Sequence, residues 1–287
     1  MPVAAAPASR APFSLELRTG LSYDSNVSVE AADVFTRRGD EALNLGASAR
    51  YRLPNLGKIN VTMGYDFDQS LYEDLKDYNL QIHTVSLSAS LPLGEASFSS
   101  DYRYFHMRLG NAPFLDMHMI TPAVGRFVTR ALYMRAGYSY IDKSFATANN
   151  LDAQTHGLEA GAFYFFQKKR GYISLTGRYE GETTRDPALS YDAVQLSTRV
   201  QIATDTWLQD SKLRLSFAYR SRDYRHPTPS LGVARTEKRY SLGASADIPL
   251  WRGFLLRPEY RWADRNSNYS FTNYRENAGA LTLLYRY

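Results

Sequence analysis

Apolar and polar residues alternate along most of this chain, and the pattern is clearest in its last residues, 277–287. Every second residue from Gly279 to Tyr287 lies on one face of an extended strand, and this face is apolar and ends in an aromatic residue. In a soluble sheet such a terminal strand leaves an edge of unpaired backbone groups, whereas a closed barrel pairs the last strand with the first. The end of the chain therefore predicts a barrel.

The same period of two predicts about fourteen strands of about 10 to 14 residues, which suit tilted membrane strands better than the shorter strands of soluble sheets. The least regular segment is 117–127, where Ile120 and Pro122 blur the alternation. We predict an all-β protein, an antiparallel transmembrane β-barrel over residues 13–287 that follows a periplasmic linker over residues 1–12. The seam between the first and last strands, with the terminal insertion signal, contains Phe13, Leu15, Leu17, Leu281, Leu283, Tyr285 and Tyr287.

The connections between these strands alternate in length. Short connections are expected at 54–57, 92–95, 128–130, 167–170, 204–210 and 249–253. Longer, polar connections are expected at 25–41, 71–78, 108–114, 145–151, 182–188, 222–236 and 266–272. Outer-membrane barrels have short periplasmic turns and longer outer loops, so an even number of strands places both termini in the periplasm.

Composition agrees with this prediction and narrows the class. The 287 residues include 22 Tyr, 14 Phe and no Cys, and the mean hydropathy is −0.41. No run approaches the roughly 20 apolar residues of a membrane helix, whereas a polar barrel interior lowers the mean hydropathy. The alternative is a soluble all-β protein. The first residues lack the charged start and apolar core of a secretory signal, so we expect a mature or truncated chain.

The net charge is +5, but Lys and Arg are spaced singly along the strands and form no cluster that would bind nucleic acid. The strand pattern places many of them on the inner face, where an arginine excess favours anionic solutes or acidic polypeptide segments. The alternative is that arginine and acid ladders pair with one another and stiffen the wall. The predicted inner arginines are Arg18, Arg50, Arg52, Arg103, Arg135, Arg178, Arg199, Arg214, Arg220, Arg257, Arg261 and Arg286. The predicted inner acids are Glu16, Asp66, Asp101, Glu159, Glu180, Asp247 and Glu259.

Catalytic and metal sites are not indicated by the sequence. The five His lack the spacing of a metal site, and no phosphate loop or nucleophile elbow is present. We expect these histidines near the membrane interfaces or in loops. The alternative is a hydrolytic site in which His, Ser and an acid come together only in the folded barrel. Asp66 and Asp68 share a face, either as a cation site or as a solvated pair. We therefore predict no enzyme, no cofactor and no metal.

Four short segments resemble a known family. YDSNV at 23–27, RNSNY at 265–269, NYREN at 273–277 and LLYRY at 283–287 are similar to the barrel domain of the surface lipoprotein assembly modifiers. That family joins periplasmic tetratricopeptide repeats to an outer-membrane barrel, and this chain contains no such repeats. The resemblance implies export of a protein or lipoprotein client to the cell surface.

Two further functions stay open at this stage. One is a porin-like or polysaccharide-conducting channel with an anion-favouring lumen, and the other is a structural or adhesive barrel that acts through its outer loops. The expected partners are the lipid bilayer of the outer membrane, the barrel-insertion machinery and a periplasmic protein or lipoprotein client. We expect a monomer without a nucleic-acid partner.

Overall fold

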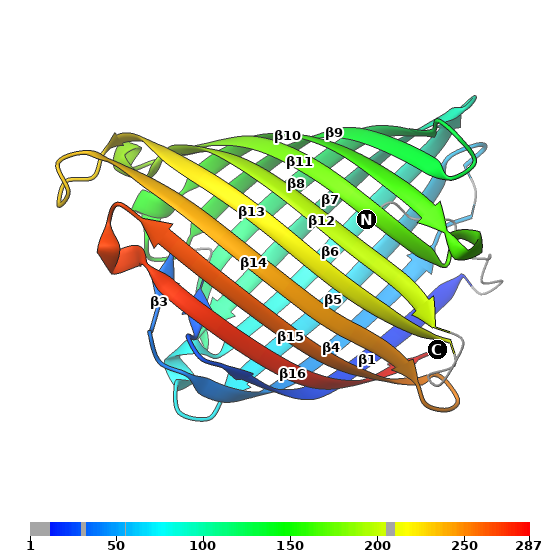
Figure 1. Ribbon diagram of the computed structural model, residues 1–287, viewed down its shortest axis with the longest axis horizontal. Helices are drawn as coiled ribbons and strands as arrows, with labels where there is room; N and C mark the ends of the chain where they lie inside the picture. The colour runs from blue at the N-terminus through cyan, green and yellow to red at the C-terminus, as the bar shows by residue number, and fades with distance from the viewer. Residues whose placement is uncertain (1–11, 30–32, 55, 205–209) are drawn as a thin grey trace.

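The computed structural model describes residues 12–29, 33–54, 56–204 and 210–287. Within these residues, fourteen long antiparallel strands close into a barrel in which β1 pairs with both β4 and β16 (Figure 1). Because the first and last long strands pair with each other, the barrel has no open sheet edge. The predicted closed barrel is confirmed. The linker predicted over 1–12 lies outside the described residues except for Pro12.

The strand bounds follow the hairpin order of the chain. The long strands are β1 (Phe13–Asp24), β4 (Asp40–Arg52), β5 (Asn60–Tyr72), β6 (Leu80–Leu93), β7 (Ala96–Leu109), β8 (Ala112–Phe127), β9 (Leu132–Phe145), β10 (Ala153–Phe166), β11 (Gly171–Thr184), β12 (Tyr191–Thr204), β13 (Ser211–Pro227), β14 (Ala234–Pro249), β15 (Phe254–Ser267) and β16 (Tyr274–Arg286). A small separate hairpin is formed by β2 (Ser28–Val29) and β3 (Val34–Phe35). Short 3₁₀ segments are η2 (Lys76–Tyr78), η3 (Asn149–Leu151), η4 (Gln167–Lys169), η5 (Pro187–Leu189) and η6 (Ser270–Thr272). No helix in the described ranges is long and apolar enough to cross a membrane.

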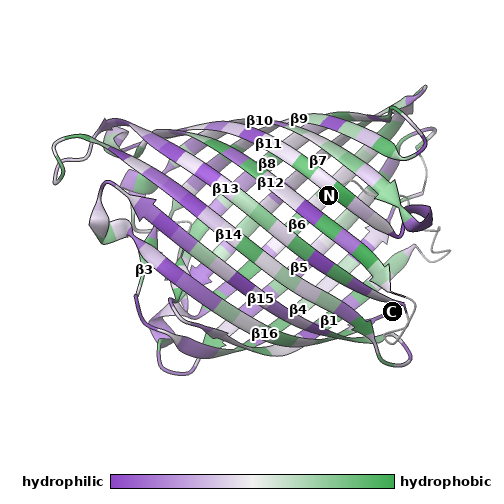
Figure 2. Cartoon of the chain, in the orientation of Figure 1, coloured by the Kyte–Doolittle hydropathy of each residue, from purple (hydrophilic) through white to green (hydrophobic). Residues whose placement is uncertain are grey.

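The strand register keeps one set of residues inside and the other outside around the whole barrel. Arg18 of β1 lies opposite Gly46 of β4 and Leu284 of β16, so these positions share the inner face. Large apolar residues occupy the outer face, where Leu21 is 67% and Leu158 61% exposed. Hydropathy accordingly changes from residue to residue along the strands (Figure 2). An apolar outer face of this kind is stable when lipid covers it.

The two ends of the barrel differ. We call the end where β1 begins and β16 ends the turn end, and the opposite end the loop end. The connection predicted as a long loop at 108–114 is wrong, because β7 and β8 continue to a two-residue turn at Gly110 and Asn111. Both residues have positive φ, of 54° and 67°, as the hairpin turn that matches strand twist requires.

The strands at the loop end also extend further than the alternation indicates. The loop predicted at 222–236 is shorter, because β13 continues to Pro227 and β14 begins at Ala234. Asp223 and Thr236 still pair across these two strands. Both faces of these strand ends are polar, so the alternation of apolar and polar residues does not indicate them. Because the strands extend this far, Arg222 and Arg235 lie on the barrel wall and not in a loop.

Candidate functional site

The inner wall carries ion pairs that run from strand to strand. Arg18 of β1 contacts Glu16 at 3.0 Å and Asp68 of β5 at 2.8 Å, and it also donates to Ser48 of β4. Its guanidinium thus crosses β4, where Gly46 leaves the room, because a Cβ there would lie 2.7 Å from Arg18 Nε. The side chain therefore ties together three neighbouring strands.

Nine of the twelve arginines that the sequence placed inside form ion pairs. The pairs beyond Arg18 are Arg50–Asp66, Arg135–Glu159, Arg178–Glu180, Arg220–Glu180, Arg214–Asp247, Arg257–Asp247, Arg261–Glu276 and Arg286–Glu16. Among the described residues, Arg52, Arg103 and Arg199 form no ion pair; all three lie on the inner face. Of the other predicted inner acids, Asp101 accepts a hydrogen bond from Ser88, and Glu259 lies opposite Ser245 and Ala280. Most of the wall is thus a paired ladder, interrupted by a few cations.

The first loop folds back into the barrel. Its small hairpin of β2 and β3 lies at the loop end, on the inner side of β13 to β15 (Figure 1). Val27 is 1% and Val29 7% exposed, and Asn26 Oδ1 accepts a hydrogen bond of 2.7 Å from the backbone of Arg37. Arg37 in turn donates to the carbonyl of Phe271 in the last loop. Buried valines and these bonds hold the hairpin inside the mouth.

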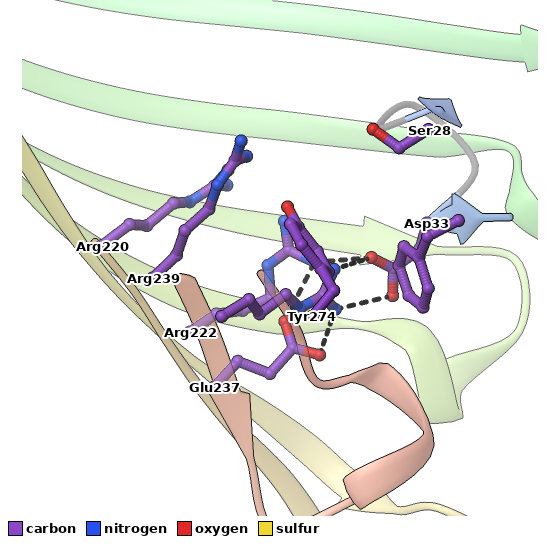
Figure 3. Close-up of a pocket in the computed structure, with 9 residues that line it drawn as sticks. Ser28, Asp33, Arg220, Arg222, Glu237, Arg239 and Tyr274 are labelled. Carbon is purple, nitrogen blue, oxygen red and sulfur yellow. Dashed lines mark hydrogen bonds and ion pairs between the residues drawn. The ribbon is translucent and has the colours of Figure 1, made fainter. Parts of the chain in front are cut away.

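Asp33, at the tip of this hairpin, is held by arginines from three strands. Figure 3 shows Asp33 on the hairpin side, facing Arg222 and Glu237 of the wall. Arg265 binds it through two contacts, of 2.5 Å to Oδ1 and 3.0 Å to Oδ2. Arg235 contacts Oδ2 at 2.9 Å, and Arg222 lies 3.9 Å from Oδ1. Glu237 contacts the same three guanidinium groups from the wall. We call Arg222, Arg235, Arg265 and Glu237 the arginine cradle.

Aromatic rings enclose the arginine cradle. Arg235 lies 4.0 Å from the ring centre of Tyr224, and Arg222 lies 4.4 Å from that of Tyr191. On the hairpin side, Phe35 stacks on Tyr274 with ring centres 5.3 Å apart. The cavity left between hairpin and wall has a volume of about 60 Å³, which is room for a few water molecules only. With Asp33 in place, the arginine cradle is therefore filled by the chain itself.

The electrostatics of Asp33 follow from these contacts. Burial raises the pKa of its carboxyl, but the hydrogen bond and charge of Arg265, with the charges of Arg222 and Arg235, outweigh burial and bring the pKa below its ordinary value. Asp33 is therefore an anion at neutral pH. Its charge is needed there, because three guanidinium groups face only one other carboxylate within the arginine cradle.

The histidines lie elsewhere. His83, His118 and His156 are on the outer face, and each hydrogen-bonds a tyrosine hydroxyl, from Tyr65, Tyr102 and Tyr138 in turn. His106 contacts Asp116 at 2.9 Å on the same face. His226 is in β13 near the loop end. These described contacts join His to Tyr or Asp and include no Ser, so they build no hydrolytic triad.

The acid pair considered as a cation site is bound by arginine instead. Asp66 contacts Arg50 at 2.7 Å and Asp68 contacts Arg18 at 2.8 Å. No group of three or more His, Cys, Asp or Glu suited to a metal ion occurs in the described part of the chain. These two carboxylates belong to the wall ladder.

The barrel seam pairs nine residues of β1 with β16, fewer than any other pairing of the long strands that the structure describes. Backbone bonds between Leu15 and Tyr287 extend it at the turn end. On the outer face, a shallow, mainly apolar depression of about 300 Å³ is lined by Leu17, Arg18, Thr19, Phe254, Leu283 and Tyr285. The residues predicted at the seam are thus brought together, with Phe13 placed opposite Tyr51 of β4.

Sequence reasoning missed the arginine cradle. Arg222 and Arg235 fell in a predicted loop, and Asp33 in another. One signal was available, because VSV at 27–29 and VF at 34–35 are more apolar than a solvated outer loop requires. Such residues in a loop indicate that it packs against something.

Comparison with solved structures finds other outer-membrane barrels. The chain is similar to a bacterial polysaccharide outer-membrane secretin, at 11% identity and a TM-score of 0.55, covering 95% of this chain and 98% of that chain. It is also similar to an anion-selective porin from Comamonas acidovorans, at 8% identity, a TM-score of 0.56 and coverage of 96% and 98%. A third similar structure is a loop-deletion variant of OmpT, an outer-membrane protein of Vibrio cholerae. Its identity is 12% and its TM-score 0.54, and the match covers 96% of this chain and 98% of that chain. At these identities the likeness concerns the fold.

Comparison with protein families identifies the family as well as the fold. Curated proteins give no significant match. The family model described as surface lipoprotein assembly modifier matches residues 22–284, which is nearly the whole chain. Family and fold together place the protein in the bacterial outer membrane and point to transport or assembly without catalysis. The barrel, with its arginine-lined lumen and internal hairpin, therefore belongs to the surface lipoprotein assembly modifier family.

Proposed function

We propose that this barrel moves a lipoprotein client from the periplasm to the cell surface. The observation that carries the proposal is the hairpin held inside the loop end by Asp33 and the arginine cradle. A mouth partly filled by the chain itself favours passage that depends on a client over free diffusion of solutes. The family match supports a role in the assembly of surface lipoproteins.

Two routes are open to such a client, through the lumen or through the seam between β1 and β16. The seam is the shortest strand pairing described above, and it has an apolar depression on its outer face. An acylated client that leaves sideways would pass from a polar lumen into lipid at this place. The lumen route instead needs the hairpin to move.

The route is tested by cross-linking the seam. The chain has no Cys, so Thr19→Cys with Leu283→Cys, at opposed positions of β1 and β16, introduces one disulfide. The matched control is Leu175→Cys with Thr198→Cys, an opposed Leu and Thr pair of β11 and β12. Lipoproteins encoded in the source genome are co-expressed, and their surface exposure is measured by protease shaving of intact cells.

We expect no client to be exposed without the barrel and one or more clients to be exposed with it. Loss of exposure in the seam disulfide alone assigns the seam route, and unchanged exposure in both disulfides assigns the lumen. If no lipoprotein becomes exposed in the presence of the folded barrel, the proposed function is wrong.

A second candidate function is an anion or polysaccharide channel. It is favoured by Arg103 and Arg199, which face the lumen without an ion pair among the described residues. A steady anion-selective current from the purified protein in planar bilayers supports this function, and a silent barrel contradicts it.

A further inference from the structure

The wall side of the arginine cradle has the form of a receptor. Arg222, Arg235 and Arg265 project from β13, β14 and β15, three strands that pair continuously. Arg235 is 9% and Arg265 8% exposed, and Tyr224 and Tyr191 pack against the guanidinium groups beside them. These exposures include the cover given by the hairpin, but the tyrosine contacts belong to the wall itself, so Arg222 and Arg235 keep them when the hairpin is away. Such pre-organisation favours a selective site.

The charges of this site do not balance within the wall. Three guanidinium groups face one wall carboxylate, Glu237, and the second carboxylate comes from Asp33 on the hairpin. The buried Nε groups of Arg222 and Arg265 have no hydrogen-bond partner. If the hairpin leaves, three guanidinium groups stay close together on the wall with one carboxylate between them, which is unfavourable unless another anion enters.

The geometry also selects the kind of anion. Arg265 grips both oxygens of Asp33 with its two terminal nitrogens, the fork arrangement that fits a planar carboxylate. The present occupant is itself a piece of polypeptide, an acid two residues before Phe35, whose ring packs on Tyr274. The site is thus shaped for an acidic residue near an aromatic or apolar one.

We infer that the arginine cradle is a binding site for acidic residues of a polypeptide in the lumen, and that Asp33 is a tethered ligand which occupies it when no such segment is present. The polypeptide nature of the ligand rests on the proposed function. Exchange of one carboxylate for another keeps the charges compensated, so the hairpin can be displaced without exposing the arginines. Binding of a client segment and release of the hairpin are then one event.

The test uses the full chain, purified and folded in detergent, with a fluorescent hexaglutamate peptide as the probe and anisotropy as the readout. A tethered competitor lowers the apparent affinity of a free ligand, so Asp33→Ala is expected to bind the peptide at least about tenfold more tightly than the unaltered chain. Arg235→Gln with Arg265→Gln is expected to abolish binding. The control is Arg50→Gln, which removes an inner-wall arginine paired with Asp66 and should leave the affinity unchanged.

Several results would overturn the inference. The inference is overturned if Asp33→Ala does not bind the peptide more tightly than the unaltered chain. This variant keeps every arginine, so its result is decisive even if the double arginine variant fails to fold. An equal loss of binding in Arg50→Gln shows a general charge effect. Displacement of the peptide by an equal concentration of inorganic phosphate shows a small-anion site instead. Because no client takes part, peptide binding and client export can fail independently.

Discussion

Arg265 and Asp33 lie 232 positions apart in the chain, and their side chains form an ion pair through two contacts, of 2.5 and 3.0 Å. The pair joins the penultimate strand to the first loop. It can form only after β1 has met β16, since closure brings the two ends of the chain together. The internal hairpin is therefore a product of the closed barrel, and its attachment can be altered without changing the strands.

Acid is expected to release the hairpin. Because the pKa of Asp33 is lowered by the arginines, its contribution to holding the hairpin is complete above the ordinary pKa of about 3.9 and is lost as the pH falls through the lower value. Single-channel conductance should stay constant from pH 7 to about 4 and rise below it. Asp33→Asn should already show the higher conductance at pH 7. Parallel pH profiles in the two proteins would contradict the assignment to Asp33.

Ion selectivity is expected to depend on the arginines that lack an ion pair. Arg103→Gln with Arg199→Gln removes two lumen charges without leaving an acid behind, so the reversal potential in a salt gradient should move toward that of a non-selective pore. The control is Arg50→Gln with Asp66→Asn, which removes a bonded pair and leaves the net charge as it was. Equal shifts in both variants would mean that single inner charges do not set selectivity.

The seam is expected to be sensitive to one methyl group. A Cβ at Gly20 would lie 2.6 Å from the carbonyl oxygen of Leu281 and 2.9 Å from the Cα of Thr282, both fixed backbone atoms of β16. Gly20→Ala should therefore lower the free energy of unfolding by about 1 to 3 kcal/mol, measured by urea titration in liposomes. Gly279→Ala in the same seam is the control, because its nearest neighbour would be 4.0 Å away. Equal stability of the two variants would show that β1 moves freely.

Glu182 is expected to matter more than an acid whose partner is exposed to water. Its carboxylate contacts Lys143 at 2.7 Å, Thr155 at 2.7 Å and Tyr191 at 3.1 Å, which links four strands from β9 to β12. Glu182→Gln leaves Lys143 without its partner and should cost about 1 to 3 kcal/mol of unfolding free energy.

The comparison for Glu182 is Asp152, whose partner Arg185 is 61% exposed. Asp152→Asn should cost about 1 kcal/mol or less, because water screens the pair. Urea titration of both variants checks the difference. A larger loss from Asp152→Asn would place the stabilising network in the loops.

The sequence determined which residues of each strand face inward. Side chains alternate strictly in a strand, and a bilayer demands an apolar outer face, so Leu17 and Arg18 identify the two faces unaided. Strand number and closure followed from the same rule. The alternation did not predict the strand ends at the loop end, where the polar residues Asp223 and Arg225 face outward. Beyond the lipid, neither face of a strand has to be apolar.

Only the tertiary structure decided which charges meet. Arg18 of β1 reaches Asp68 of β5 across the whole width of β4. Such partners depend on the register between strands, and the alternation of residues does not specify the register. The same holds for Leu284, a completely buried side chain on the inner face. It holds above all for Asp33, because its contact with Arg265 depends on closure of the barrel and on the fold of a loop, and neither leaves a periodic mark in the sequence.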